Sequence, residues 1–247
     1  MRRAVSRRRA LVEAALFLPM AGEALGGQQS ASKKRKLVVA GGHPGDPEYG
    51  CGGTIARCAD FGYDITLLYL NRGEKGCAGK SAAECGALRV AEAQKACRIL
   101  GAQAKFADQI DGEAVVDAGH YESFRRLVAG EEPDVVLTQW PIDNHRDHRA
   151  TSMLVYDAWL QMGKRFALYY YEVSDGEDTM MFSPTDYVDI GGTEARKRAA
   201  CYAHASQSPD RFYALQAEVT RFRGLESGHR QAEAFVRHAE SAGRWLP

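Results

Sequence analysis

Residues 37–53 read LVVAGGHPGDPEYGCGG, a wholly apolar run that leads into a glycine-rich segment. The apolar run, residues 37–40, is typical of a short strand buried on both faces of a parallel sheet. The glycines permit a tight turn and close packing of the next helix on the strand. The segment lacks the G-x-G-x-x-G pattern, and the next expected strand ends in Asn71-Arg72 rather than an acidic residue, so a dinucleotide-binding site is disfavoured.

Outward from this segment, the expected strands and helices alternate along the chain. The expected strands cover residues 37–40, 65–70, 104–107, 135–138, 166–173 and 187–190. The expected helices cover residues 54–61, 82–100, 120–129 and 151–162, with two or three more between residues 193 and 242. Such alternation predicts an α/β fold with a mostly parallel, doubly wound sheet, in a single domain over residues 33–247.

The composition excludes several classes of protein. Hydrophobic residues make up 45% and charged residues 26% of the 247 residues, which is usual for a globular domain with a normal core. The 32 basic and 32 acidic side chains balance, so the sequence has no basic footprint for nucleic acid. The longest uncharged apolar run near the N-terminus, residues 14–22, is far too short for a membrane span.

Residues 1–32 have the order of an export signal. Five arginines lie among the first nine residues, a moderately apolar stretch follows over residues 10–25, and small residues come next. Residues 6–11 read SRRRAL, which is similar to the twin-arginine signal. We therefore expect an export signal and tether that direct the protein to the periplasm or the extracellular space. A disordered basic tail is the alternative.

Export makes disulfide bonds permissible. Cys77 and Cys85 are the best candidate pair, because they lie close together in a segment rich in Gly, Lys and Ser. The other four cysteines fall in stretches expected to be buried, where cysteine behaves as a small core residue. No C-x-x-C pair is present, so the sequence gives no support for a structural zinc site or a thioredoxin-like role.

Histidines and carboxylates follow two of the expected strands. His43 and Asp46 come after the first strand, and His145, Asp147 and His148 come after the fourth. In open parallel sheets, ligands bind beyond the carboxyl ends of the strands, where these residues converge. Two imidazoles and one carboxylate with open positions form the usual ligand set of catalytic zinc, and the same set suits ferrous iron. The sequence therefore predicts a metal site at this edge.

Together these motifs resemble the LmbE/PIG-L family of zinc-dependent N-acetylglucosaminyl deacetylases. The resemblance rests on His-Pro-x-Asp at 43–46, GCGGTIA at 50–56, RGE at 72–74, HRDH at 145–148, and Lys197 with HASQ at 204–207. It covers residues 37–240 with the motifs in order. It implies a Rossmann-like three-layer sandwich that removes the N-acetyl group of an amino sugar or glycoconjugate.

The resemblance also implies the roles of individual residues. His43, Asp46 and His148 would bind one Zn²⁺ per chain. His145 would stabilise the oxyanion and protonate the leaving amine, with Asp147 orienting His145. By the same resemblance, substrate contacts would come from Arg72 and Gln207.

One position departs from the family pattern. The family usually has an aspartate as general base where this chain has Gly45, and loss of a positioned base typically costs 10²–10⁴-fold in rate. Glu48 and Asp143 are the nearest candidates for a substitute base. We expect an active or weakly active zinc-dependent deacetylase. The alternative is a metal-binding protein that recognises carbohydrate without turnover.

Overall fold

The computed structural model describes residues 33–173, 178–241 and 243–247. Residues 34–247 form one compact unit, which the description below concerns. The expected export signal lies outside the described residues. No helix among those residues is both long and apolar enough to cross a membrane.

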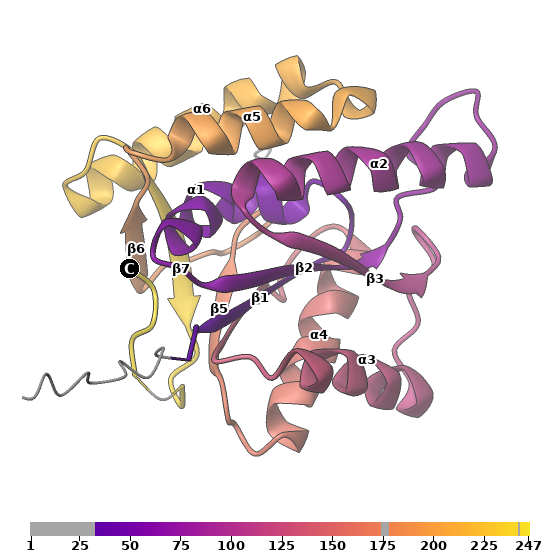
Figure 1. The fold of residues 1–247 in the computed structure, drawn as a ribbon, viewed down its shortest axis with the longest axis horizontal. Coiled ribbons are helices and arrows are strands. Elements are labelled where there is room, and N and C mark those ends of the chain that lie inside the picture. The colour runs from indigo at the N-terminus through magenta and orange to yellow at the C-terminus, as the bar shows by residue number, and fades with distance from the viewer. Residues whose placement is uncertain (1–32, 174–177, 242) are drawn as a thin grey trace, which may run out of the picture. The chain divides into compact units, whose positions relative to one another are not determined.

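Seven strands form one sheet in the order β3-β2-β1-β4-β5-β7-β6 (Figure 1). The first five strands of that order run parallel, and β7 is antiparallel to both β5 and β6. The strands are β1 (Lys36–Gly41), β2 (Asp64–Asn71), β3 (Gln103–Gln109), β4 (Val135–Gln139), β5 (Ala167–Tyr171), β6 (Asp186–Asp189) and β7 (Ala232–Arg237). The predicted mostly parallel α/β fold is confirmed.

Helices cover both faces of this sheet. In Figure 1, α1, α2, α5 and α6 lie on one side and α3 and α4 on the other. The helices are α1 (Asp46–Asp60), α2 (Ala82–Leu100), α3 (Ala118–Glu131), α4 (Arg146–Gln161), α5 (Glu194–Ala203) and α6 (Pro209–Ser227), with a short 3₁₀ helix η1 (Ala205–Gln207). This is the three-layer arrangement expected from the sequence.

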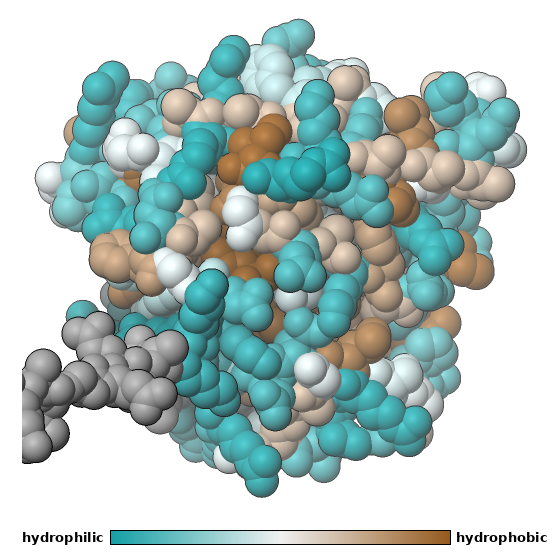
Figure 2. Space-filling view, viewed as in Figure 1, coloured by the Kyte–Doolittle hydropathy of each residue, from teal (hydrophilic) through white to brown (hydrophobic). Residues whose placement is uncertain are grey.

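The sheet separates two hydrophobic cores, because successive side chains of a strand point to opposite faces. In β1, Leu37 and Val39 belong to the core under α1, α2 and α5, whereas Val38 belongs to the core over α3 and α4. Burial on both faces explains why β1 is wholly apolar. On the surface, Figure 2 shows mostly hydrophilic residues with hydrophobic ones in smaller patches.

The glycine-rich segment differs from its prediction. We expected a turn up to Gly53, but α1 begins at Asp46, three residues after His43, with Pro47 in its first turn. A kink at Cys51, where φ is −147°, divides the helix. A side chain at Gly50 would lie 2.4 Å from the ring of Tyr171, so the glycine lets the helix pack closely on β5. α4 likewise begins at Arg146 rather than at residue 151.

Strand β7 is the second correction, because its segment was expected to be helical. Phe235 and Val236 pair with Tyr171 and Tyr170 of β5 and fill a position in the sheet interior. The local composition of this segment did not predict a strand or its pairing with β5. Burial between two strands, rather than intrinsic propensity, determines the structure of such short segments.

Candidate metal centre

The expected site residues lie at the carboxyl ends of β1 and β4. These strands are neighbours and run parallel, with Val38 opposite Val136. From β1 the chain continues to β2 on one side, and from β4 it continues to β5 on the other, so the two connections run toward opposite edges of the sheet. Ligands of doubly wound sheets bind at such a switch point.

One carboxylate oxygen of Asp46 joins the two histidines expected to bind metal. Asp46 Oδ2 lies 3.2 Å from Nδ1 of His43 and 3.2 Å from Nε2 of His148. The side-chain amide of Gln139 donates a hydrogen bond to the same oxygen, at 3.1 Å. The structure therefore brings the three predicted ligands together, each with a nitrogen or oxygen directed toward the others.

The charges in this cluster favour protonated histidines and an ionised Asp46. Burial opposes protonation of His148, but the Asp46 and Asp143 carboxylates outweigh it and raise its pKa to about 9. Burial likewise opposes ionisation of Asp46, yet His148 and His43 hold the pKa of that carboxyl well below its usual range. A bound cation would satisfy the same carboxylate that here attracts the protonated imidazoles.

In both histidines, the ring nitrogen that does not face Asp46 contacts another carboxylate. Nδ1 of His148 lies 3.1 Å from Asp143 Oδ1. Nε2 of His43 lies 3.1 Å from Asp147 Oδ2 and 3.2 Å from Asp111 Oδ1. Histidine ligands in metalloproteins usually donate their second N–H to a carboxylate, which fixes the ring orientation. The surroundings of His43 and His148 match that pattern.

This geometry corrects the expected partner of Asp147. Its buried carboxylate accepts hydrogen bonds from the Asn71 side chain at 3.0 Å and the Gly112 backbone at 2.7 Å, besides its contact with His43. To His145, Asp147 offers its backbone N–H, 3.3 Å from Nδ1. The Asp147 carboxylate therefore orients His43, and not His145.

His145 lies beside the predicted ligands at a cavity of about 480 Å³, which we call the histidine pocket. Its ring centroid is 4.6 Å from that of His43 and 4.7 Å from that of His148. Burial and the two neighbouring imidazoles lower the pKa of His145. The pocket is lined by His43, Pro44, Gly45, Asp46, Tyr49, Lys75, Gly76, Arg89, Asp111, Gly112, His145, His148, Val173, Asp178, His204, Gln207 and Phe212.

Neither candidate for a substitute base lines this pocket. The buried carboxylate of Glu48 accepts hydrogen bonds from the Gly45 backbone at 3.1 Å and the Tyr69 hydroxyl at 2.7 Å. It also lies 3.0 Å from Nε2 of His204. Asp143 accepts from the His145 backbone at 2.7 Å and also holds His148. Both carboxylates therefore have structural partners and do not line the cavity.

Of the two residues predicted to contact substrate, one lines the histidine pocket and the other does not. Gln207 lines the pocket, and its side-chain amide donates to the Gly76 carbonyl at 3.3 Å. Arg72 forms an exposed ion pair with Asp108 at 2.7 Å and borders a separate hollow between α2 and β3. The structure therefore places Gln207 at the pocket and Arg72 outside it.

Several pocket residues were missed by the sequence analysis. Asp111 follows β3, which also ends at this edge of the sheet, so the strand-end rule would have found it. His204 belongs to the HASQ motif at 204–207, which the sequence analysis quoted without giving this histidine a role. Arg89 lies within α2, and only its tertiary position brings it to the pocket, so no local signal marks it in the sequence.

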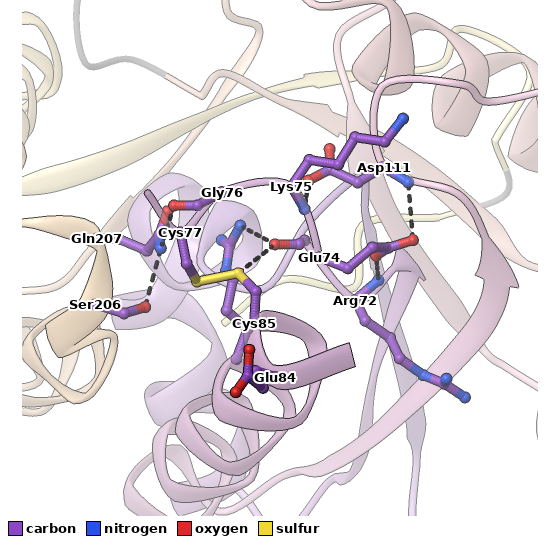
Figure 3. The surroundings of a disulfide bond; sticks show 12 residues. Arg72, Glu74, Lys75, Gly76, Cys77, Glu84, Cys85, Asp111, Ser206 and Gln207 are labelled. Atoms are coloured by element: carbon purple, nitrogen blue, oxygen red, sulfur yellow. Dashed lines mark hydrogen bonds between the residues drawn. A yellow bond between two sulfur atoms is a disulfide. The ribbon is translucent and has the colours of Figure 1, made fainter. Parts of the chain in front are cut away.

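Cys77 and Cys85 form the disulfide that the sequence analysis expected (Figure 3). It links the loop after β2 to the first turn of α2, with Cα atoms 5.6 Å apart. Gly76, next to Cys77, and Lys75 line the histidine pocket. The other four cysteines are free and buried, as expected.

The comparisons with known proteins agree with this geometry. The family model described as GlcNAc-PI de-N-acetylase, PIG-L, matches residues 37–159. This segment is therefore similar to the PIG-L family. It carries both histidine motifs, and diacetylchitobiose deacetylase from Thermococcus kodakarensis is 29% identical to the chain over 221 residues, 81% of each protein.

Solved structures show a likeness in fold that extends beyond residue 159. A conserved protein from Thermus thermophilus is 28% identical with a TM-score of 0.73, over 85% of this chain and 97% of that one. A 4-carboxy-2-hydroxymuconate hydratase from Pseudomonas putida is 21% identical with a TM-score of 0.76, over 86% of this chain and all of that one. The latter likeness shows the fold alone, so the chemistry must be argued from the site.

Proposed function

We propose that this protein is a zinc-dependent hydrolase that removes the N-acetyl group of an amino sugar or glycoconjugate. The observation that carries the proposal is the contact of one Asp46 oxygen with both His43 and His148, at 3.2 Å each. The diacetylchitobiose deacetylase relative supports the choice of an N-acetylated sugar as substrate.

The residues present fit a zinc ion. Two imidazoles and a carboxylate suit zinc and leave coordination positions open, and the same donors also accept ferrous iron. His43, Asp46 and His148 would hold the ion, while Asp147 and Asp143 fix the histidine rings. When bound, zinc supplies an acidified water and polarises the amide carbonyl.

The remaining steps fall to side chains of the pocket. His145 lies at the cavity beside the ligands, where its imidazole can stabilise the oxyanion and deliver a proton to the departing nitrogen. The amide C–N bond breaks, the acyl carbon gains the hydroxyl of water, and the nitrogen gains the proton. The products are acetate and a free amine.

Metal content and acetate release from the full-length chain test this proposal together. We expect about one zinc per chain and stoichiometric acetate and amine from at least one member of a panel of N-acetylated amino sugars. His145→Gln serves as the matched variant, which we expect to keep its zinc and lose activity by about 10²-fold or more. A chain that binds no metal would contradict the proposal.

A second candidate is a protein that binds metal and carbohydrate without turnover. Gly45 carries no side chain, and Glu48 and Asp143 both face structural partners, which favours this candidate. The outcome that distinguishes it is zinc bound at one per chain, saturable binding of an N-acetylated sugar, and no acetate release from any panel member.

A further inference from the structure

Arg89 is buried at the histidine pocket without an ion-pair partner among the described residues. It comes from α2 and is 6% exposed. Its guanidinium donates through Nη2 to the Pro44 carbonyl at 2.7 Å and through Nη1 to the Gly73 carbonyl at 3.2 Å. Within the part of the chain that the structure describes, Nε has no hydrogen-bond partner.

Burying a guanidinium in this way is costly. Burial lowers the pKa of Arg89, while the more distant charges of Asp46 and Asp111 act in the opposite direction. An arginine is always charged in a protein, so the desolvation cost remains. A leucine or methionine would fill the same volume without that cost, so the two backbone hydrogen bonds are what the guanidinium specifically provides.

These two hydrogen bonds join two segments of the site. Pro44 lies between His43 and Gly45 in the segment that also carries Asp46. Gly73 lies in the loop between β2 and α2, four residues before Cys77 of the disulfide shown in Figure 3. Gly45 has a φ of +112° and no side chain, and its backbone N–H donates to Glu48 at 3.1 Å. The Pro44 carbonyl is a second, separate point at which Arg89 holds the ligand segment.

Two glycines make the space that the guanidinium occupies. A Cβ at Gly73 would lie 2.1 Å from Nη1 of Arg89, and a Cβ at Gly76 would lie 2.7 Å from it. The loop has separate attachments elsewhere: the Lys75 backbone donates to Asp111 at 3.0 Å, and the Gly76 carbonyl accepts from Gln207. The loop can therefore stay in place without Arg89.

We propose that Arg89 is a positioning residue of the metal centre, which holds the ligand segment at Pro44, whereas the disulfide holds only the pocket wall. The two devices then have separable effects. Loss of Arg89 weakens metal binding, because His43 and Asp46 lose their fixed separation. Loss of the disulfide weakens substrate binding and leaves metal binding intact, because no ligand belongs to the loop.

Calorimetry with zinc tests the first effect and needs no substrate, although the inference rests on the proposed zinc site. We expect at least tenfold weaker zinc binding in Arg89→Met and a smaller loss in Arg89→Lys, which retains one donor group. Arg98→Met is the matched control on the same helix, because Arg98 is exposed. A natural chain that binds no zinc would overturn the proposed function as well, whereas equal affinity in Arg89→Met would overturn this inference alone.

Gly76→Ala keeps the test decisive if Arg89→Met does not fold. The added methyl displaces the guanidinium while Arg89 itself stays, and φ at Gly76 lies outside the region that requires glycine. We expect the same weakening of zinc binding at an unchanged melting temperature. Unchanged zinc affinity in this folded variant would likewise overturn the inference.

The disulfide arm uses the double variant Cys77→Ser/Cys85→Ser. We expect its zinc affinity to stay within twofold of the natural chain and its KM for the N-acetylated sugar to rise severalfold. Dithiothreitol, which reduces the disulfide to two thiols, should reproduce the rise in the natural chain and have no effect on the double variant. An equal loss of zinc affinity in the double variant would overturn the separation of roles.

Discussion

Gly45 has a backbone conformation that constrains any attempt to restore a side chain there. Its φ of +112° is a region that residues with a Cβ rarely adopt, although a Cβ would meet no atom nearer than 3.7 Å. We expect Gly45→Ala to lower the free energy of unfolding by about 1–2 kcal/mol through backbone strain. Denaturant unfolding measures this, with Gly192→Ala as control because Gly192 has neither a positive φ nor a close neighbour. Equal effects of the two substitutions would contradict the explanation.

The same strain applies to Gly45→Asp. An aspartate there would be a base only at that conformational cost, so a modest gain in activity would not measure the value of the carboxylate. Stability and rate must therefore be compared in the same variant.

Asp147 acts on His43, and a substitution can show how strongly. We expect Asp147→Asn to weaken zinc binding by about 10–100-fold, which is typical for carboxylates that orient a histidine ligand. Asp108→Asn is the control, since Asp108 forms an exposed ion pair away from the pocket. Calorimetry measures both. Unaltered zinc affinity in Asp147→Asn would argue against an orienting role.

At the scale of elements, a buried ion pair connects three of them. Lys197 of α5 lies 2.6 Å from Glu233 of β7, and both side chains are almost fully buried. Glu233 also accepts hydrogen bonds from the Gly53 and Thr54 backbones, at 2.9 and 2.7 Å. These N–H groups follow the kink at Cys51, so Glu233 caps the second half of α1.

Removing one partner of this pair should be severe. We expect Lys197→Met to lower the free energy of unfolding by about 3–5 kcal/mol, because it leaves a buried carboxylate without its cation. Arg221→Met is the control, since Arg221 forms an exposed pair with Glu218 and such pairs contribute about 0–1 kcal/mol. Thermal or denaturant unfolding compares them. A loss below about 1 kcal/mol for Lys197→Met would show that the pair is not important for stability.

The elements were predicted from sequence as far as local patterns reach. Short apolar runs located β1, β2, β4 and β5, and α2 was predicted with its observed bounds, Ala82–Leu100. The structure shows a serine cap at its start and a glycine at its end. The start of α1 was wrong because its glycines suggested a turn, whereas contact with β5 and α5 stabilises the helix. β7 was missed because its neighbours in the sheet are remote in sequence.

At the scale of the whole molecule, the motifs predicted the site and the sheet brought it together. The three expected metal ligands converge because β1 and β4 are adjacent, and that adjacency follows from the fold class. The position of Arg89 and the orientation of the Asp147 carboxylate could not be predicted from the sequence, because both depend on contacts between segments that are distant in the chain.

We propose that the protein is exported by its twin-arginine-like N-terminus. The expected result is a processed chain outside the cytoplasm, and loss of that fraction in Arg7→Lys/Arg8→Lys, since lysine preserves the charge but not the motif. Cell fractionation and immunoblotting measure it. Arg2→Lys/Arg3→Lys is the control, and equal loss in both variants would indicate that only charge matters.

The position of β7 has a consequence for the order in which the sheet is assembled during synthesis. β6 leaves the ribosome before α5, α6 and β7, yet it pairs with β7 and not with β5. Until β7 is made, β5 exposes an unpaired edge and β6 has no partner in the sheet. This part of the sheet therefore cannot form until β7 has been synthesised. A nascent chain that is paused between β6 and β7 already contains the metal ligands, but the edge of β5 is still unpaired.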